Sequence, residues 1–162
     1  MKLSVQVSRY KLKELPQKAA EVVSGHITQA IFRLGEKYSN IIRNRSEEES
    51  WHNVSGNLRS GIGAAVYEKG KLVIATAFET VLNGYTGSAK GKRLVEELAA
   101  LYTDGYTLAL VSSMEYSEKV ERLDGRDVLA SAETGIGREF ENTIKEAMKG
   151  AEKELQSLFD NL

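Results

Sequence analysis

The chain has 162 residues, of which 41% are hydrophobic and 28% charged, and its formal net charge at pH 7 is -1. This length and composition are typical of one globular domain with its own core, so we take residues 1–162 as a single domain. The absence of cysteine excludes disulfides, thiolate metal sites and thiol nucleophiles, and fits a reducing compartment. The near-neutral charge gives no global attraction to nucleic acid or to an anionic membrane.

The N-terminal segment alternates apolar and polar residues. Leu3, Val5 and Val7 alternate with polar side chains, which predicts a short half-buried strand; a disordered terminus is the alternative. This alternation differs from the apolar block of a secretory signal. Because no apolar run approaches the roughly 18 residues of a membrane helix, we expect a protein made in the cytoplasm with no membrane partner.

A long helical pattern follows, from about Leu15 to Arg43. Its apolar residues recur at spacings of three and four, which places them on one face of a helix, and Pro16 suits the first helical turn. Gly25 and Gly35 are weak helix formers, and a kink or break is expected at one of them. The apolar face is interpreted as core packing, with the alternative that its far end contacts a neighbouring subunit.

The pattern changes from helix to strand within Val54–Ser60, a run of turn and capping residues in which a short helix is expected near Ser55. Apolar residues then alternate over residues 62–66 and 72–74, and the glycine-containing run Glu68–Lys71 separates these two stretches. Two antiparallel strands joined by a tight turn are predicted. Tyr106–Ser112 is a β-rich run between turn signals and is predicted to be the central strand.

Asn83–Lys92 is rich in glycine and carries positive charge, so we predict a mobile loop that orders against a partner. Its candidate interface residues are Gly84, Tyr85, Gly87, Lys90, Gly91 and Lys92. The run is not a P-loop, because three residues rather than four precede the Gly-Lys pair and Arg93 stands where Ser or Thr would hold magnesium. Three basic residues and one tyrosine do not define a nucleic-acid site. A short amphipathic helix is expected after this loop.

The last third of the chain predicts two helical turns over Glu115–Glu121, a turn at Asp124–Arg126, a brief strand at Val128–Leu129 and a helix from about Ala132 to Phe159. The whole pattern predicts an α+β fold, with an antiparallel β-sheet flanked by a long N-terminal helix and a C-terminal helix.

No catalytic or metal-binding constellation is visible in the sequence. His26 and His52 are the only histidines, and neither has a partner at the spacing of a zinc motif. His52 with Ser55 or Ser60 lacks a nucleophile elbow, so hydrogen bonding within the turn is the favoured role for His52. We therefore expect no enzyme activity, no metal and no cofactor.

Three segments together resemble one family. The run Val54–Ile62 (VSGNLRSGI) resembles the signature (V/D)-T-G-x-L-R-x-S-I of bacteriophage tail-completion and head–tail joining proteins, the gene-product-ten-like neck family. Met114–Glu121 (MEYSEKVE) resembles that family's M-x-Y-A-x-x-V-E segment. Ser55 replaces the usual Thr, Gly61 the usual Ser and Ser117 the usual Ala. The helix from Ala132 resembles the closing helix of the family.

The resemblance implies a structural protein of the virion that forms a ring with copies of itself, commonly a hexamer. Its other partners would be the head-closure or connector proteins and the tail tube, with DNA only passing through the lumen. The alternatives are a tail-tube or minor capsid component, or a cytosolic binding module unrelated to virions. The residues implied to carry the family motif and its subunit contacts are Val54, Gly56, Leu58, Arg59, Tyr116 and Glu121. Within this motif, we expect Gly56 to permit a turn, Leu58 to anchor it to the core, and Arg59 to reach either a neighbouring subunit or the helix ends.

Overall fold

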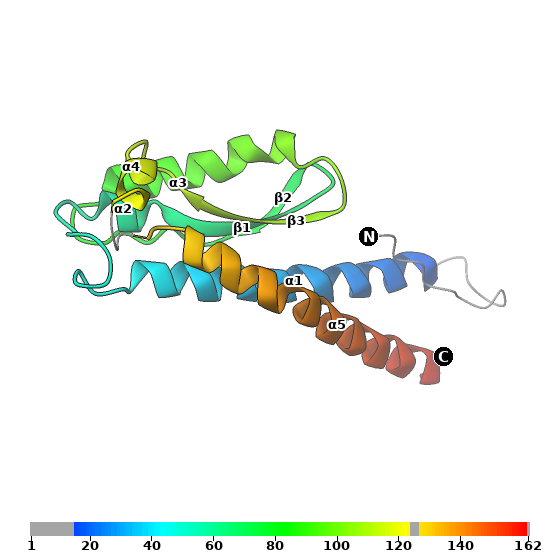
Figure 1. Cartoon of the computed structure of the whole chain (residues 1–162). Coiled ribbons are helices and arrows are strands. Elements are labelled where there is room, and N and C mark those ends of the chain that lie inside the picture. Colours follow the sequence, from blue (N-terminus) through cyan, green and yellow to red (C-terminus); the bar gives the residue numbers. More distant parts are fainter. Residues whose placement is uncertain (1–14, 124–126, 162) are drawn as a thin grey trace.

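The computed structural model describes residues 15–123 and 127–161, in which a three-stranded antiparallel sheet lies between two helical layers (Figure 1). Helices α1 (Leu15–Arg43) and α5 (Ala130–Asp160) cover one face of the sheet, and α3 (Tyr85–Leu98) covers the other. The predicted α+β fold with a long N-terminal helix and a C-terminal helix is confirmed. The strand expected at Leu3–Val7 and the turn expected at Asp124–Arg126 lie outside the described residues.

The strand order is β2-β1-β3, where the strands are β1 (Ile62–Glu68), β2 (Lys71–Ala75) and β3 (Tyr106–Ser112). Within the described residues β1 lies between the other two strands, so Tyr106–Ser112 is an edge strand of this three-stranded sheet and not the central strand that was predicted. The central strand is buried on both faces, but its small residues, Gly63 to Ala65, give a weaker apolar signal than those of β3. β3 pairs with β1 along its whole length, with Ile62 opposite Ser112 and Glu68 opposite Tyr106.

β1 and β2 form the predicted hairpin. Lys69 and Gly70 both have positive φ, 48° and 81°, as a two-residue type I′ turn requires. Such turns match the right-handed twist of the flanking strands, and a bulge between Val66 and Tyr67 adjusts the register of this pair.

The two faces of the sheet belong to two different clusters of the core. Every second residue of the strands faces α3. Tyr67 of β1 and Val111 of β3 are among them, and they pack in one cluster with Val95 of α3. The residues between them, Val66 and Leu108, pack against Ile27 and Ile31 of α1. This alternation follows from the period-2 geometry of a strand.

α1 is one uninterrupted helix from Leu15 to Arg43, so it has no break at Gly25 or Gly35. A Cβ atom at Gly35 would lie 2.6 Å from Leu108 Cδ1 and 2.8 Å from Ala64 Cβ. The glycine therefore lets α1 lie close to the sheet. None of the helices within the described ranges combines the length and apolarity needed to cross a membrane.

Three short elements complete the fold: α2 (Asn57–Ser60), the 3₁₀ helix η1 (Ala99–Leu101) and α4 (Ser117–Glu121). The brief strand predicted at Val128–Leu129 is wrong. These residues lead directly into α5, which begins at Ala130. The backbone amide of Leu129 donates to the Glu121 carboxylate and is therefore not available to pair with a strand.

Candidate functional site

The two motif segments meet at one end of the molecule, which we call the junction end (left in Figure 1). It contains the C-terminus of α1, helices α2 and α4, and the N-terminus of α5. A hollow of about 320 Å³ lies between the segments. Its lining includes Val54, Gly56 and Leu58 from the first segment, Trp51 just before that segment, and Tyr116 and Val120 from the second segment. The fold thus brings together two segments that lie about 60 residues apart in the sequence.

Arg59 is an internal linking residue. Its side chain is only 6% exposed, and its guanidinium donates to the Arg43 carbonyl at the end of α1 (2.5 Å) and to Ser50 Oγ (3.1 Å). The guanidinium also lies 5.1 Å from the centre of the Trp51 ring, within cation–π range. Burial lowers the pKa of Arg59, and the charge of Glu47 partly offsets this effect. Of the two predicted roles, Arg59 takes the one at a helix end, and its burial excludes the contact with a neighbouring subunit.

Glu121 caps the N-terminus of α5. Its carboxylate accepts hydrogen bonds from the backbone amides of Leu129 (3.0 Å) and Ala130 (2.8 Å). A carboxylate at this position satisfies amides that have no partner within the helix and interacts favourably with the helix dipole. Glu121 therefore joins α4 to α5 within one chain.

A second link joins the end of α1 to the start of α5. Arg45 Nη1 contacts Asp127 Oδ2 at 3.1 Å and the Asp127 carbonyl at 2.8 Å, and its other nitrogen donates to Ser131 Oγ. Burial opposes ionisation of Asp127, but the hydroxyl and amide of Ser131 and the charge of Arg45 outweigh it, so the pKa of Asp127 is lowered.

Gly56 and Leu58 have the predicted roles. Gly56 has φ 78°, and a Cβ there would lie 1.8 Å from the Val81 carbonyl oxygen, so the turn requires glycine both for conformation and for space. Leu58 is buried in a core cluster with Ile42 and Trp51.

The segment Asn83–Lys92 is not a loop. Gly84 precedes α3, and the other predicted loop residues, Tyr85, Gly87, Lys90, Gly91 and Lys92, lie inside the helix. The glycines provide close approach instead of mobility. A Cβ at Gly87 would lie 1.9 Å from the Asn57 carbonyl oxygen, and one at Gly91 would lie 2.2 Å from the Phe78 ring. α3 can therefore pack directly on α2 and on Phe78.

The positive charges of this segment are partly neutralised. Lys90 forms an ion pair with Glu115 at 2.5 Å, and Arg93 forms one with Glu97 at 2.6 Å. The hydrogen bond from Lys90 lowers the pKa of Glu115. Lys92 is exposed on the same helix. These pairs leave no continuous basic surface on α3 that would favour a nucleic-acid site.

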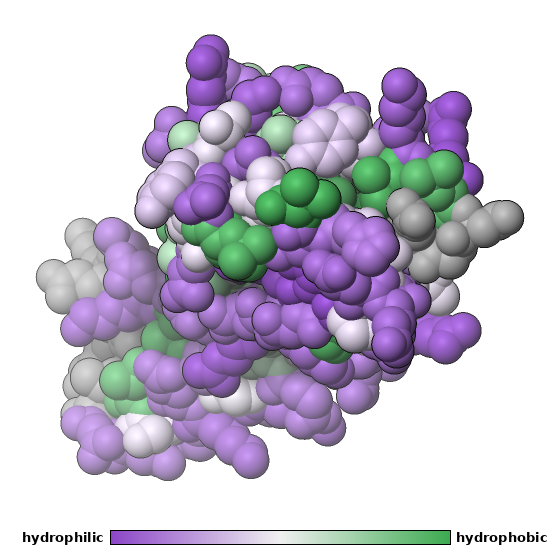
Figure 2. Space-filling view, turned by 90° about the vertical axis from the view of Figure 1, so that its left-hand side faces the viewer, coloured by the Kyte–Doolittle hydropathy of each residue, from purple (hydrophilic) through white to green (hydrophobic). Residues whose placement is uncertain are grey.

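Exposed apolar side chains gather at the junction end, and we call Val54, Leu82, Tyr85 and Tyr116 the tip surface. Val54 is 89% exposed, Leu82 62% and Tyr85 70%, and Tyr116 lines the hollow. Gly56 brings the loop of Val54 against Leu82, whose Cβ lies 3.1 Å from the place of a Gly56 Cβ. Figure 2, which faces this end, shows hydrophobic side chains interrupted by polar ones.

Leu82 combines exposure with an unusual backbone. Its φ is 51°, in the left-handed region that leucine rarely adopts. Leu82 is not among the residues predicted from the sequence, since no pattern around it signals a positive φ. Phe78, with the same φ of 51°, is by contrast buried under α3.

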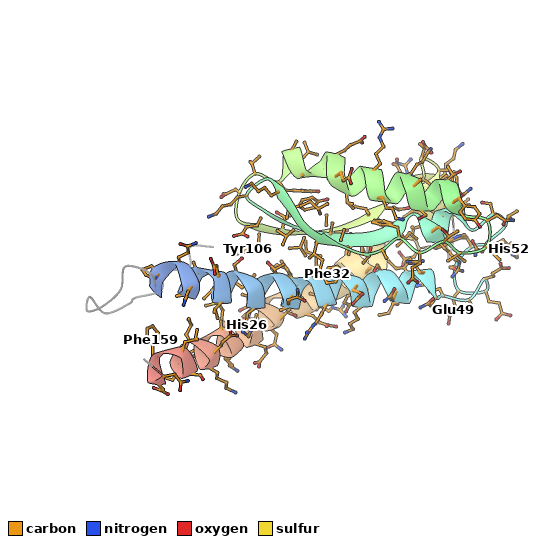
Figure 3. The ribbon with its side chains drawn as sticks, turned by 180° about the vertical axis from the view of Figure 1, so that it is seen from behind. His26, Phe32, Glu49, His52, Tyr106 and Phe159 are labelled. Carbon is orange, nitrogen blue, oxygen red and sulfur yellow. The ribbon has the colours of Figure 1, made fainter. Side chains whose placement is uncertain are left out.

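The two histidines lie in different parts of the molecule (Figure 3). His52 Nδ1 lies 2.8 Å from Glu47 Oε2 in the loop after α1, as the predicted hydrogen bonding within the turn requires. The backbone amide of Asn53 and His52 together lower the pKa of Glu47. His26 Nε2 lies 2.7 Å from Glu154 Oε2 and joins α1 to α5. Across the described ranges, no three His, Asp or Glu side chains are grouped as a metal ion would require.

The geometry of the junction end is that of a tightly linked structural unit with an apolar exposed surface. Searches against protein-family models, curated proteins and solved structures found no match to this chain.

Proposed function

We propose that the protein is a structural virion component of a tailed phage or prophage, which forms a ring at the head–tail junction and joins the head-closure proteins to the tail tube. The proposal begins from the resemblance of Val54–Ile62 and Met114–Glu121 to the neck family. It gains support from the fold, which places both segments around one hollow at the junction end.

The observation that carries the proposal is the tip surface, above all Leu82. A left-handed backbone destabilises a non-glycine residue by about 1–2 kcal/mol. In the free subunit the Leu82 side chain is exposed, so burial of its apolar surface offsets little of this strain. Strained exposed residues of this kind concentrate at sites of contact and switching. A neighbouring subunit that covers Leu82 would supply the missing burial.

A ring follows naturally from a contact of this type. The tip surface lies at one end of an elongated subunit, so it would contact a different surface of the next copy (Figure 1). Such head-to-tail contacts close into a ring when the rotation between subunits allows it. The near-neutral chain lets DNA pass through the lumen without strong attraction.

The test is Leu82→Asn, because asparagine tolerates the left-handed conformation but removes the apolar side chain. The free energy of unfolding of the monomer should stay unchanged or rise by up to about 1 kcal/mol, while ring assembly is lost in analytical ultracentrifugation and native mass spectrometry. Leu101→Asn is the matched control, since Leu101 is 71% exposed in η1, near the hairpin at the other end of the sheet. If both variants assembled like the unaltered protein, the tip surface would not be the contact.

Particle imaging tests the position in the virion. Antibody label on purified virions is expected at the head–tail junction, and deletion of the gene should give filled heads without tails. Label confined to the cytoplasm of infected cells, with particles unaffected by the deletion, would favour the cytosolic binding module. Label along the tail or on the head would favour the tail-tube or minor capsid alternatives.

A further inference from the structure

The outer edge of β3 is open. Within residues 15–123 and 127–161, β3 pairs with β1 on one side and with no strand on the other. An unpaired strand of seven residues presents a row of backbone donors and acceptors that readily binds another strand. The side chains of Tyr106, Leu108 and Leu110 alternate along this edge and face the layer of α1 and α5.

An apolar shelf on α5 continues from that face. Phe140, Ile144 and Met148 pack against the same buried cluster, Ile27 and Ile31, that receives Tyr106 and Leu108. Beyond Met148, the shelf extends along a groove of about 390 Å³ whose apolar lining is Val23, Met148, Leu155 and Phe159. Figure 3 shows Tyr106 and Phe159 at the same end of the molecule, with the N-terminal half of α1 between them. Phe159 is 38% exposed, so this end of the shelf is only partly covered by the described residues.

We propose that Leu3–Val7 of the same chain pairs antiparallel with the outer edge of β3 and adds a fourth strand to the sheet. The segment has the required pattern, since Leu3, Val5 and Val7 alternate with Ser4 and Gln6. With Val5 opposite Leu108, Val7 stands opposite Tyr106 and Leu3 opposite Leu110. All three apolar side chains then face the α5 shelf, and the polar ones face the opposite side of the sheet.

The length of the chain before α1 permits this arrangement and fixes its direction. Ser24 of α1 donates a hydrogen bond to Glu68, which pairs with Tyr106, so Ser24 is level with the start of β3. Leu15 lies nine residues earlier, about 14 Å beyond that level. Residues 8–14 span up to about 23 Å, which suffices for the return when Val7 is the strand residue nearest Tyr106. That direction is antiparallel to β3.

The same chain is favoured over a second copy by this short link. A tether of seven residues holds the segment at an effective concentration in the millimolar range, above the protein concentration of an ordinary solution. The pairing therefore completes each subunit by itself and does not depend on the proposed ring.

Engineered cysteines test the pairing, because the natural chain has none. In the predicted register Gln6 stands opposite Thr107 on the α3 side of the sheet, so Gln6→Cys with Thr107→Cys in the full chain should form an intrachain disulfide under mild oxidation. The control pair combines Gln6→Cys with Val73→Cys on β2, the opposite edge strand, and should remain reduced. Disulfides between chains would assign the edge to a second copy and overturn the proposal, as would equal oxidation of the two pairs.

A second comparison does not depend on cysteines. Val5→Asp places a charge on the α5 shelf, whereas Ser4→Asp places it on the other side of the sheet, where the segment carries its own polar residues. The backbone amides of Leu108 and Leu110 point away from β1, because hydrogen-bonded and non-hydrogen-bonded pairs alternate along the β1–β3 ladder. These two amides should exchange about tenfold faster in Val5→Asp than in the unaltered chain, as loss of one buried valine implies. Ser4→Asp should leave their exchange unchanged. Identical exchange in both variants and the unaltered chain would show that the edge of β3 is not covered by this segment.

Discussion

Gly87→Ala distinguishes a glycine needed for space from a glycine needed for flexibility. Gly87 lies in α3, where its amide donates to Asn57 Oδ1 at 3.0 Å and its carbonyl accepts from Ser113 Oγ at 3.0 Å. An added Cβ would lie 1.9 Å from the Asn57 carbonyl oxygen and 2.9 Å from Asn57 Cα, both backbone atoms of α2. No side-chain rotation can relieve this overlap, so α2 and α3 must separate.

The expected magnitude has three parts. Replacing glycine with alanine within a helix stabilises it by about 1 kcal/mol. Overpacking costs about 1–3 kcal/mol, and misalignment of the two hydrogen bonds costs about 1 kcal/mol each. The net expectation for Gly87→Ala is a free energy of unfolding lowered by about 2–4 kcal/mol. That change is large for a domain of this size, whose melting temperature shifts by about 2–4 °C per kcal/mol.

Gly25→Ala is the matched control, because Gly25 also lies within a helix but nothing lies within 4 Å of the place of its Cβ. It should raise the free energy of unfolding by about 0.5–1 kcal/mol. Denaturant unfolding of both variants, followed by circular dichroism, measures the difference. If Gly87→Ala were as stabilising as Gly25→Ala, the close contact of α2 with α3 would be refuted, and a flexible segment would again be the better interpretation.

Three further predictions concern single side chains. Arg59→Ala should lower the free energy of unfolding by about 2–4 kcal/mol, because it leaves the carbonyl at the end of α1 and the Ser50 hydroxyl without their buried donor. Arg93→Ala on the exposed side of α3 should change it by less than about 0.5 kcal/mol in the same urea titration. Glu121→Ala should lower the free energy of unfolding by about 1–2 kcal/mol, because α5 loses its N-terminal cap. Thermal unfolding of this variant is compared with that of Glu118→Ala, which changes an exposed glutamate of α4. Similar losses of stability in the two variants would contradict the capping role. Burial raises the pKa of Tyr67 to about 12, so stability present below pH 10 should fall as the pH rises from 10 towards 12. Tyr67→Phe should remove part of that slope in unfolding measured at several pH values, and an unchanged slope would exclude Tyr67 as its source.

The elements that the sequence predicts correctly are those with a long or regular pattern. α1 and α5 carry apolar residues at helical spacing over 29 and 31 residues, so many positions in each match the helical period and the prediction does not depend on any single residue. The hairpin is signalled by Lys69-Gly70 between two alternating runs. By contrast, β1 is made largely of glycine and alanine, so its central position depends on tertiary contacts and not on its hydrophobicity.

The errors at the site arise from glycines. Gly84, Gly87 and Gly91 indicate a flexible loop by composition, but their spacings of three and four place them on one side of a helix. Ser88 continues the same small-residue face and is buried, with its hydroxyl donating to the Phe78 carbonyl. A face of this kind favours close helix packing, and its periodicity was the signal available in the sequence. The left-handed Leu82 has no comparable signal, because only its neighbours in the fold hold that conformation.

The links at the junction end also set the order in which a newly synthesised chain can complete it. Arg45 and Arg59 emerge from the ribosome early, but Asp127 and Ser131, the partners of Arg45, lie in the last quarter of the chain. Glu121 likewise cannot cap α5 until that helix has been made. Because α5 packs along α1, its absence also leaves the apolar side of α1 uncovered. A polypeptide that stops before α5 therefore lacks the finished junction end.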